Sequence, residues 1–180
     1  MNYSKRVMLN SIILYVKIII TMLISLVSVP MILNALGKSD YGLYNLIAGV
    51  ISMLSFLNAS MSITTQRFLS VAIGEKNNEK LNNIYNTSLV LHIILGLIIV
   101  VLLEVCYLFL FDGFLNITEN RIYAAKIVFH IVATILCITF ITTPFRALYI
   151  ARENIVYVSI VDVLDGMMKV IFALLLSVIT

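Results

Sequence analysis

The stretch that decides the fold is NSIILYVKIIITMLISLVSVPMILNALG, residues 10–37. It contains one charged side chain, Lys17. Roughly 20 consecutive apolar residues are enough to cross the hydrocarbon core of a bilayer as an α-helix. Lys5 and Arg6 precede the stretch, but it is longer than the apolar core of about 7–15 residues found in a signal peptide. The sequence therefore predicts an uncleaved membrane span over about residues 10–35.

The composition of the whole chain also indicates a membrane environment. Of its 180 residues, 62% are hydrophobic and 12% are charged, whereas soluble domains carry about 25% charged residues. The other apolar runs are too long, and alternate too little, for the roughly 10-residue strands of a membrane barrel. We therefore predict an all-α integral membrane protein, one transmembrane helical bundle over residues 1–180. The four further helices are expected at about residues 41–71, 86–111, 118–143 and 155–180.

Turn signals set the expected boundaries. Gly37 is a helix stop, and Asp112-Gly113 predicts a turn. Residues 74–83 are strongly hydrophilic and predict a short amphipathic connector. Pro144 is expected to bend or end its helix, because proline removes a backbone donor. The chain stops without a polar tail after an odd number of spans, so we expect it to be the N-terminal piece of a longer protein.

The loops differ in their positive charge, which predicts the orientation, since cytoplasmic loops are enriched in lysine and arginine. Two residues flank the outer side, Lys38 and Arg121. The sequence thus predicts a cytoplasmic N-terminus. The cations on the cytoplasmic side are Lys5, Arg6, Arg67, Lys76, Lys80, Arg146 and Arg152.

Signatures of enzymes and of nucleic-acid binding are missing from the sequence. It has no glycine-rich phosphate loop and no zinc-type spacing of ligands, and His92 and His130 are isolated along the chain. The short loops leave no room for a soluble catalytic domain, and no basic run suggests nucleic acid. Cys106 and Cys137 lie in apolar runs and are interpreted as inert thiols. We expect neither enzyme activity nor a cofactor or metal.

Polar residues inside the predicted spans are the candidates for function. Charges at bilayer depth cost roughly 2.5–3.5 kcal/mol each on insertion scales, so they usually face a bundle interior or an aqueous cavity. Asp165 and Lys169 could also be a structural i, i+4 pair, Lys126 could reach the interface, and Glu104 could pair locally or titrate. Two helices show a polar face at helical spacing: Lys17, Thr21, Ser25 and Ser28 in the first, and Asp162, Asp165 and Lys169 in the last.

Three motifs resemble one family of transporters. They are LGKSDYGLYNLI at residues 36–47, TTQRF at 64–68 before the Gly-Glu-Lys connector, and PFRAL at 144–148 leading to AREN at 151–154. Together they resemble the Wzx-like flippases of lipid-linked oligosaccharides, the polysaccharide branch of the MOP superfamily, which is related to the MATE drug transporters. The resemblance covers nearly the whole chain through positional patterns rather than catalytic signatures.

The resemblance implies a function in the bacterial inner membrane. A transporter of this type has two lobes of about six helices, so this chain would form most of the N-terminal lobe. By alternating access it would flip an undecaprenyl-diphosphate-linked oligosaccharide for the synthesis of surface polysaccharide such as O-antigen or lipopolysaccharide. Its partners would be the lipid bilayer, that substrate and the missing C-terminal lobe. The candidates are Lys17, Arg67, Arg146 and Lys169 for binding the diphosphate, and Glu104, Asp162 and Asp165 for ion coupling.

Three other functions remain open at this point. A MATE-like multidrug or cation antiporter would favour acidic cavity residues, and the mixed charge here favours an anionic substrate instead. A membrane enzyme such as an oligosaccharide polymerase would need a large external loop. An inactive fragment of a transporter is favoured if the gene ends at residue 180.

The orientation is testable by cysteine labelling in a background without Cys106 and Cys137. Probes at Ser39 and Asn116 should react with a membrane-impermeant maleimide added to intact cells. Probes at Asn78 and Glu153 should react only after the cells are opened. Labelling of position 78 from outside would reverse the orientation.

Overall fold

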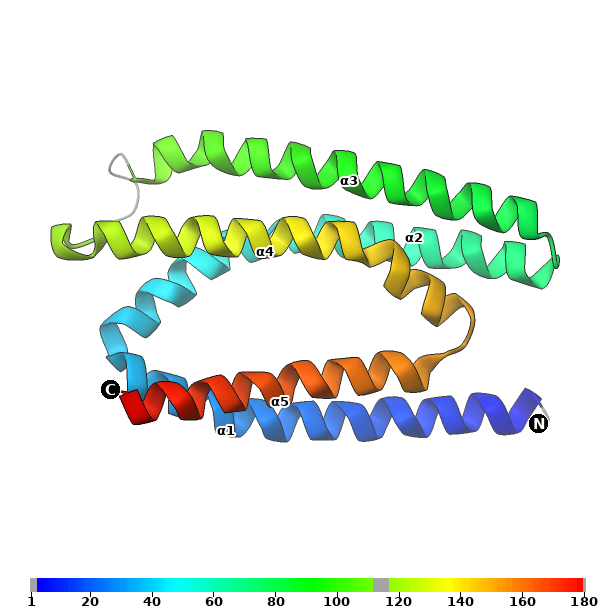
Figure 1. The fold of residues 1–180 in the computed structure, drawn as a ribbon, viewed down its shortest axis with the longest axis horizontal. Helices are drawn as coiled ribbons and strands as arrows, with labels where there is room; N and C mark the ends of the chain where they lie inside the picture. The colour runs from blue at the N-terminus through cyan, green and yellow to red at the C-terminus, as the bar shows by residue number, and fades with distance from the viewer. Residues whose placement is uncertain (1–2, 112–116, 180) are drawn as a thin grey trace. The chain divides into compact units, whose positions relative to one another are not determined.

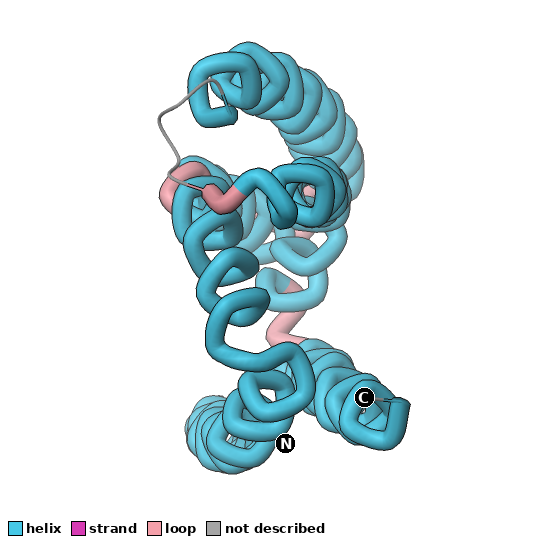
Figure 2. Tube along the Cα trace, turned by 90° about the vertical axis from the view of Figure 1, so that its left-hand side faces the viewer, coloured by secondary structure: helices cyan, strands magenta, loops and turns pink. Residues whose placement is uncertain are grey.

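The computed structural model describes residues 3–111 and 117–179, and in these ranges the chain is almost entirely helical (Figures 1 and 2). The predicted all-α class is confirmed, with no strand in the described part. The turn expected at Asp112-Gly113 lies outside the described residues. The helices are α1 (Tyr3–Ser52), α2 (Ser55–Gly74), α3 (Asn78–Phe109), α4 (Glu119–Ala151) and α5 (Ile155–Ile179).

Three helical segments of the described chain are long and apolar enough to cross a membrane: Val7–Ser52 in α1, Asn78–Phe109 (α3) and Glu119–Ala151 (α4). The helix α5 is not among them, because every 18-residue window within it contains Asp162, Asp165 and Lys169. The helix α2 carries Asn, Gln, Arg and many hydroxyls in only 20 residues. Five helices are therefore present as expected, and composition alone qualifies three of them as spans.

The helix stop predicted at Gly37 is present as a break in α1. Gly37 has a non-helical backbone (φ 75°, ψ 163°) where two helices meet at a kink, and the second helix follows without the expected loop and continues to Ser52. Glycine adopts this positive φ without the steric cost that a Cβ brings. The helix expected over residues 41–71 is divided by a turn at Met53 and Leu54, after which α2 begins.

The connector between α2 and α3 is shorter than expected. Only residues 75–77 are non-helical, and α3 begins at Asn78. The side chain of Asn77 accepts a hydrogen bond of 2.9 Å from the backbone N–H of Lys80, which is an N-cap. Glu79 lies in the first turn, where its charge complements the helix dipole. These local signals extend α3 by eight residues relative to the predicted start at residue 86.

The helix α4 also runs past its expected end. Pro144 lies inside it and the helix continues to Ala151, although Figure 1 shows the ribbon bending in its last part. The side chain of Pro144 is fully buried. Next to it, the hydroxyl of Thr143 donates 2.9 Å to the amide oxygen of Asn58 on α2. Packing and this polar contact hold the helix on both sides of the proline, so the proline bends it rather than ending it.

The chain divides into two compact units, residues Gly42–Ala151 and residues Met1–Tyr41 with Arg152–Thr180. In the first unit, α2, α3 and α4 pack against one another. Its core contains Phe129 and Phe140 of α4 and Ile99 of α3, all nearly inaccessible. In the second unit, the first part of α1 contacts α5. The single bundle predicted over residues 1–180 stays a prediction.

A close helix contact depends on Gly96 of α3. A Cβ built at Gly96 would lie 3.3 Å from the Cβ of Phe140 and 3.7 Å from the carbonyl oxygen of Cys137, both on α4. Small residues at such positions let the backbones of membrane helices approach. The missing side chain at residue 96 therefore sets the distance between α3 and α4.

Replacing this glycine should loosen the unit. Gly96→Leu should lower the free energy of unfolding by about 1–3 kcal/mol, since overpacking forces neighbouring side chains or the helix to shift. Gly49→Leu on α1 is the matched control, because a Cβ there meets nothing within 4 Å. Thermal unfolding in detergent should show a lower midpoint for the first variant only. Equal midpoints would contradict the close packing.

Candidate functional site

The two predicted polar faces lie against the same pocket. A cavity of about 230 Å³ in the unit of residues 1–41 and 152–180 is lined by side chains of α1 and α5. The sequence placed each set on one face of its own helix, and the structure brings the two sets together. The lining residues are Lys17, Thr21, Ile24, Ser25 and Ser28 of α1, and Asp162, Asp165, Gly166 and Lys169 of α5.

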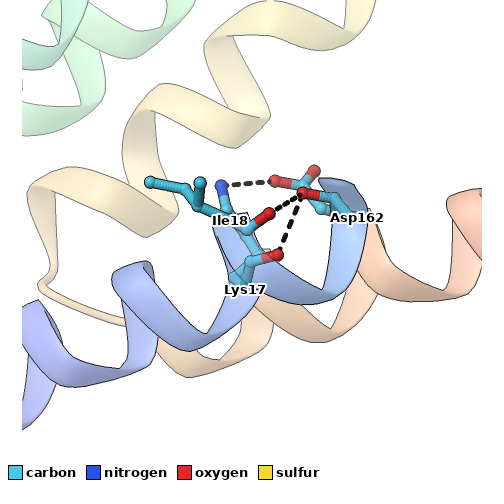
Figure 3. A network of polar contacts seen from close by, with 4 residues as sticks. Lys17, Ile18 and Asp162 are labelled. Atoms are coloured by element: carbon cyan, nitrogen blue, oxygen red, sulfur yellow. Dashed lines mark hydrogen bonds and ion pairs between the residues drawn. The ribbon is translucent and has the colours of Figure 1, made fainter. Parts of the chain in front are cut away.

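An ion pair connects the two helices at one end of this pocket. The ammonium nitrogen of Lys17 lies 2.9 Å from Oδ2 of Asp162, and Figure 3 shows the two side chains pointing toward each other. Only 18% of the lysine side chain and 20% of the aspartate side chain are exposed. From the sequence, Asp162 had no evident partner in its own helix, and the structure supplies one from α1.

The second ion pair is local. Lys169 and Asp165, four residues apart on α5, approach to 2.7 Å. Their side chains are 64% and 65% exposed, far more than those of the first pair. The i, i+4 pairing considered from the sequence is therefore present. Because it lies within one helix, it neutralises the charges without holding α5 to α1.

The hydroxyls of the α1 stripe are arranged by the backbone. Thr21 donates 2.9 Å to the carbonyl of Lys17, and Ser25 donates 2.9 Å to the carbonyl of Thr21. Ser28 makes a longer contact of 3.5 Å with the carbonyl of Ser25. A hydroxyl that donates to its own helix keeps its oxygen lone pairs available. The stripe therefore offers acceptors to the pocket beside the charged groups.

A small residue permits the approach of the two helices. A Cβ built at Gly166 would lie 3.2 Å from two side-chain carbons of Ile24. The isoleucine thus packs directly on the backbone of α5, next to the charged pocket. The two lysines and two aspartates on this site sum to no net charge, so a ligand or a proton that neutralises one partner leaves the other partner charged and available.

The remaining candidates belong to the other unit. Arg67 on α2 and Arg146 on α4 are both exposed. Glu104 on α3 pairs with α4, because its Oε1 lies 3.1 Å from Nδ1 of His130. Both of these side chains are half exposed. This pairing of Glu104 with His130 could not be predicted from the sequence, because the hydrophobic period of one helix does not define its register against another helix. Lys126 lies 5.8 Å from the ring centre of Tyr107, a cation–π contact.

The burial of one histidine was not predicted from the sequence. His92 on α3 is fully inaccessible, and its Nδ1 lies 2.7 Å from the carbonyl oxygen of Ser88. A carbonyl can only accept, so Nδ1 carries the proton in this contact. The other ring nitrogen, Nε2, has no hydrogen-bond partner in the described residues. Every interior helix residue has a backbone carbonyl four residues before it, so the sequence spacing does not single out this contact.

The fold and the site define a multi-helix membrane protein in which an ion pair between Lys17 and Asp162 connects two helices. Comparison with known families agrees with this class. The family model of MatE matches residues 14–180, and the chain belongs to this family of MOP-type membrane transporters.

Among curated proteins, the chain is similar to an uncharacterized membrane protein, EpsK, of Bacillus subtilis (strain 168). The two are 22% identical over 158 residues, which is 88% of this chain and 31% of the relative. The chain thus spans about a third of the length of that relative. No solved structure matches the chain.

The interhelical pair gives a direct test of the site. Lys17→Met or Asp162→Asn alone should reduce both the amount of inserted protein and its thermal stability, because each removes one half of the 2.9 Å ion pair. A charge at bilayer depth costs roughly 2.5–3.5 kcal/mol, and this pair offsets part of that cost. The double variant Lys17→Met/Asp162→Asn should recover most of the loss. Lys169→Met, at the exposed pair, should cost less than Lys17→Met.

Membrane protein levels and unfolding midpoints in detergent measure these effects. A double variant no more stable than the single variants would mean that Lys17 and Asp162 do not depend on each other.

Proposed function

We propose that this chain forms part of a transporter that flips an undecaprenyl-diphosphate-linked oligosaccharide across the bacterial inner membrane, for surface polysaccharide synthesis. The observation that carries the proposal is the pocket between α1 and α5, which combines two lysines with a row of hydroxyls inside a membrane helix pair. A diphosphate is an anion with several acceptor oxygens. The two lysines supply charged donors, which such a group requires to leave water.

The two ion pairs suggest how binding and release alternate. In the described state each lysine of the pocket is neutralised by an aspartate, at 2.9 Å for Lys17 and 2.7 Å for Lys169. A diphosphate that approaches the lysines competes with Asp162 and Asp165. In this proposal Asp162 and Asp165 exchange protons when the substrate displaces them from the lysines. Proton uptake and substrate binding are thereby linked, as coupled transport requires.

Residues of the other unit have supporting roles in this proposal. Arg67 and Arg146 are exposed cations that would attract the diphosphate head group at the cytoplasmic side predicted for them. Glu104 would be a further site of proton exchange, since it is half exposed and already faces the titratable ring of His130. A second lobe would complete the transport pathway, with the N-terminus in the cytoplasm and alternating access between the two lobes.

A MATE-like antiporter of drugs or other organic cations is the second candidate. The observation that favours it is the same pocket, because Asp162 and Asp165 give it as much negative as positive charge. A cationic substrate would compete with the lysines for these carboxylates. The flippase proposal requires the lysines for recognition, whereas the antiporter requires the aspartates.

Export of surface glycan in the bacterium that carries the gene distinguishes these functions. At equal protein levels, Lys17→Ala and Lys169→Ala should reduce export at least tenfold relative to Lys126→Ala, a loss of about 1.4 kcal/mol or more. Lys126 is a suitable control, because it contacts an aromatic ring rather than the pocket. The measurement is surface polysaccharide together with the leaflet in which labelled lipid-linked oligosaccharide accumulates.

The charge-balanced variants Lys17→Met/Asp162→Asn and Lys169→Met/Asp165→Asn guard against simple misfolding. If the lysines meet the diphosphate, both double variants should insert normally and remain inactive. Recovery of export would make the pairs structural. Unchanged export with loss of ethidium efflux in the aspartate variants would instead support the cation antiporter.

A further inference from the structure

A second candidate site is a groove within the unit of residues 42–151. It has a volume of about 520 Å³ and runs between α2 and α3. Ligand sites commonly measure about 300–1,000 Å³. No charged side chain lines it, and its apolar part includes the ring of Phe68. Its polar lining consists of Ser60, Thr64, Thr65, Asn83, Thr87 and Ser88.

Two hydroxyls in this groove are buried without a hydrogen bond. Thr65 on α2 is 6% exposed and Ser88 on α3 is 9% exposed. Their neighbours Ser60 and Thr64 donate 3.0 Å to the carbonyls four residues before them, as hydroxyls in helices usually do. Within the described ranges, the side chains of Thr65 and Ser88 make no such bond. A hydrogen bond between one of these hydroxyls and a ligand would contribute about 0.5–1.5 kcal/mol.

These two hydroxyls are open to the groove rather than sealed in the packing. Among described residues, the sealed side-chain atoms without a partner are Nε2 of His92 and the hydroxyl oxygen of Ser159. The oxygens of Thr65 and Ser88 therefore remain accessible to a molecule in the groove that both residues line. They come from two different helices, so one ligand can engage both walls.

The lining restricts the chemistry of that ligand. Without a lysine, arginine, aspartate or glutamate, the groove gives no counter-charge to a phosphate or a cation. A hydrocarbon chain would fill the apolar part and leave both hydroxyls unpaired. A sugar ring has hydroxyls that pair with Thr65, Ser88 and the amide of Asn83. It also has an apolar C–H face that can pack against Phe68.

We propose that the α2–α3 groove binds a sugar unit of the transported oligosaccharide, separately from the lysines that take the diphosphate. This inference rests on the proposed function for the presence of an oligosaccharide. In this proposal, neutral hydroxyl and amide groups on α2 and α3 bind the sugar. The lysines on α1 and α5 bind the charged diphosphate.

Binding to the purified full-length protein tests the groove. The probe is the free oligosaccharide released by mild acid from the lipid-linked pool of the bacterium that carries the gene, titrated by calorimetry. Thr65→Val and Ser88→Ala should each raise Kd roughly threefold to tenfold, the effect of losing one neutral hydrogen bond. The matched controls are Ser70→Ala, exposed on α2 outside the groove, and Thr134→Val, whose hydroxyl donates to the carbonyl of His130. Neither control should change Kd.

Several outcomes would overturn the inference. They are an absence of binding by the free oligosaccharide, an unchanged Kd in both groove variants, or an equal loss in the controls. If sugar-free undecaprenyl phosphate binds and is weakened by the same two substitutions, the groove holds a lipid chain instead.

The test separates this inference from the proposed function. If Lys17→Ala abolishes flipping while the groove variants bind normally, the flippase stands and the groove assignment falls. If sugar binding depends on Thr65 and Ser88 but no lipid-linked oligosaccharide is flipped, the groove stands and the proposed transport falls.

Discussion

An unpaired charge in the hydrocarbon core costs roughly 2.5–3.5 kcal/mol, and the contact between α1 and α5 follows from that cost. Lys17 lies within the apolar stretch that defines the first span, and Asp162 lies in a helix with three charges. Each would be expensive alone. The 2.9 Å ion pair offsets much of this cost, and it connects one face of α1 to one face of α5. The neighbouring hydroxyls line the pocket between these faces.

The remaining polarity of the helices is satisfied in a different way. Hydroxyls such as Thr21, Ser60 and Thr64 donate to carbonyls of their own helix, which lets a polar residue enter a span at little cost. Departures from this rule are therefore informative. Thr65 and Ser88 depart from it together, on two helices that border one groove. Under the two proposals, the charged pocket takes the diphosphate of the substrate and the neutral groove takes a sugar unit.

Local sequence signals predicted where helices exist better than where they end. Gly37 was expected to stop a helix, and its non-helical backbone does separate two helices within α1, but the next helix follows it without a loop. Pro144 was expected to end or bend α4, and the helix continues because Thr143 and the buried proline are held by packing. Conversely, the N-cap at Asn77 starts α3 earlier than hydropathy suggested. A helix end depends on the balance between local backbone preference and packing. Sequence patterns report the local preference but not the packing.

The sequence by itself determined the membrane environment, the all-helical class and the polar faces of the first and last helices. Hydropathy and the 3.6-residue period are properties of a single segment and can be read without the tertiary structure. It placed Lys17 on one face of its helix, and Asp162 with Lys169 on one face of theirs. Only the tertiary structure decided that Asp162 meets Lys17, that Glu104 meets His130, and that Thr65 and Ser88 share a groove. Each of these contacts joins two helices. Their relative register and rotation result from packing across the whole interface, which no period within one helix records.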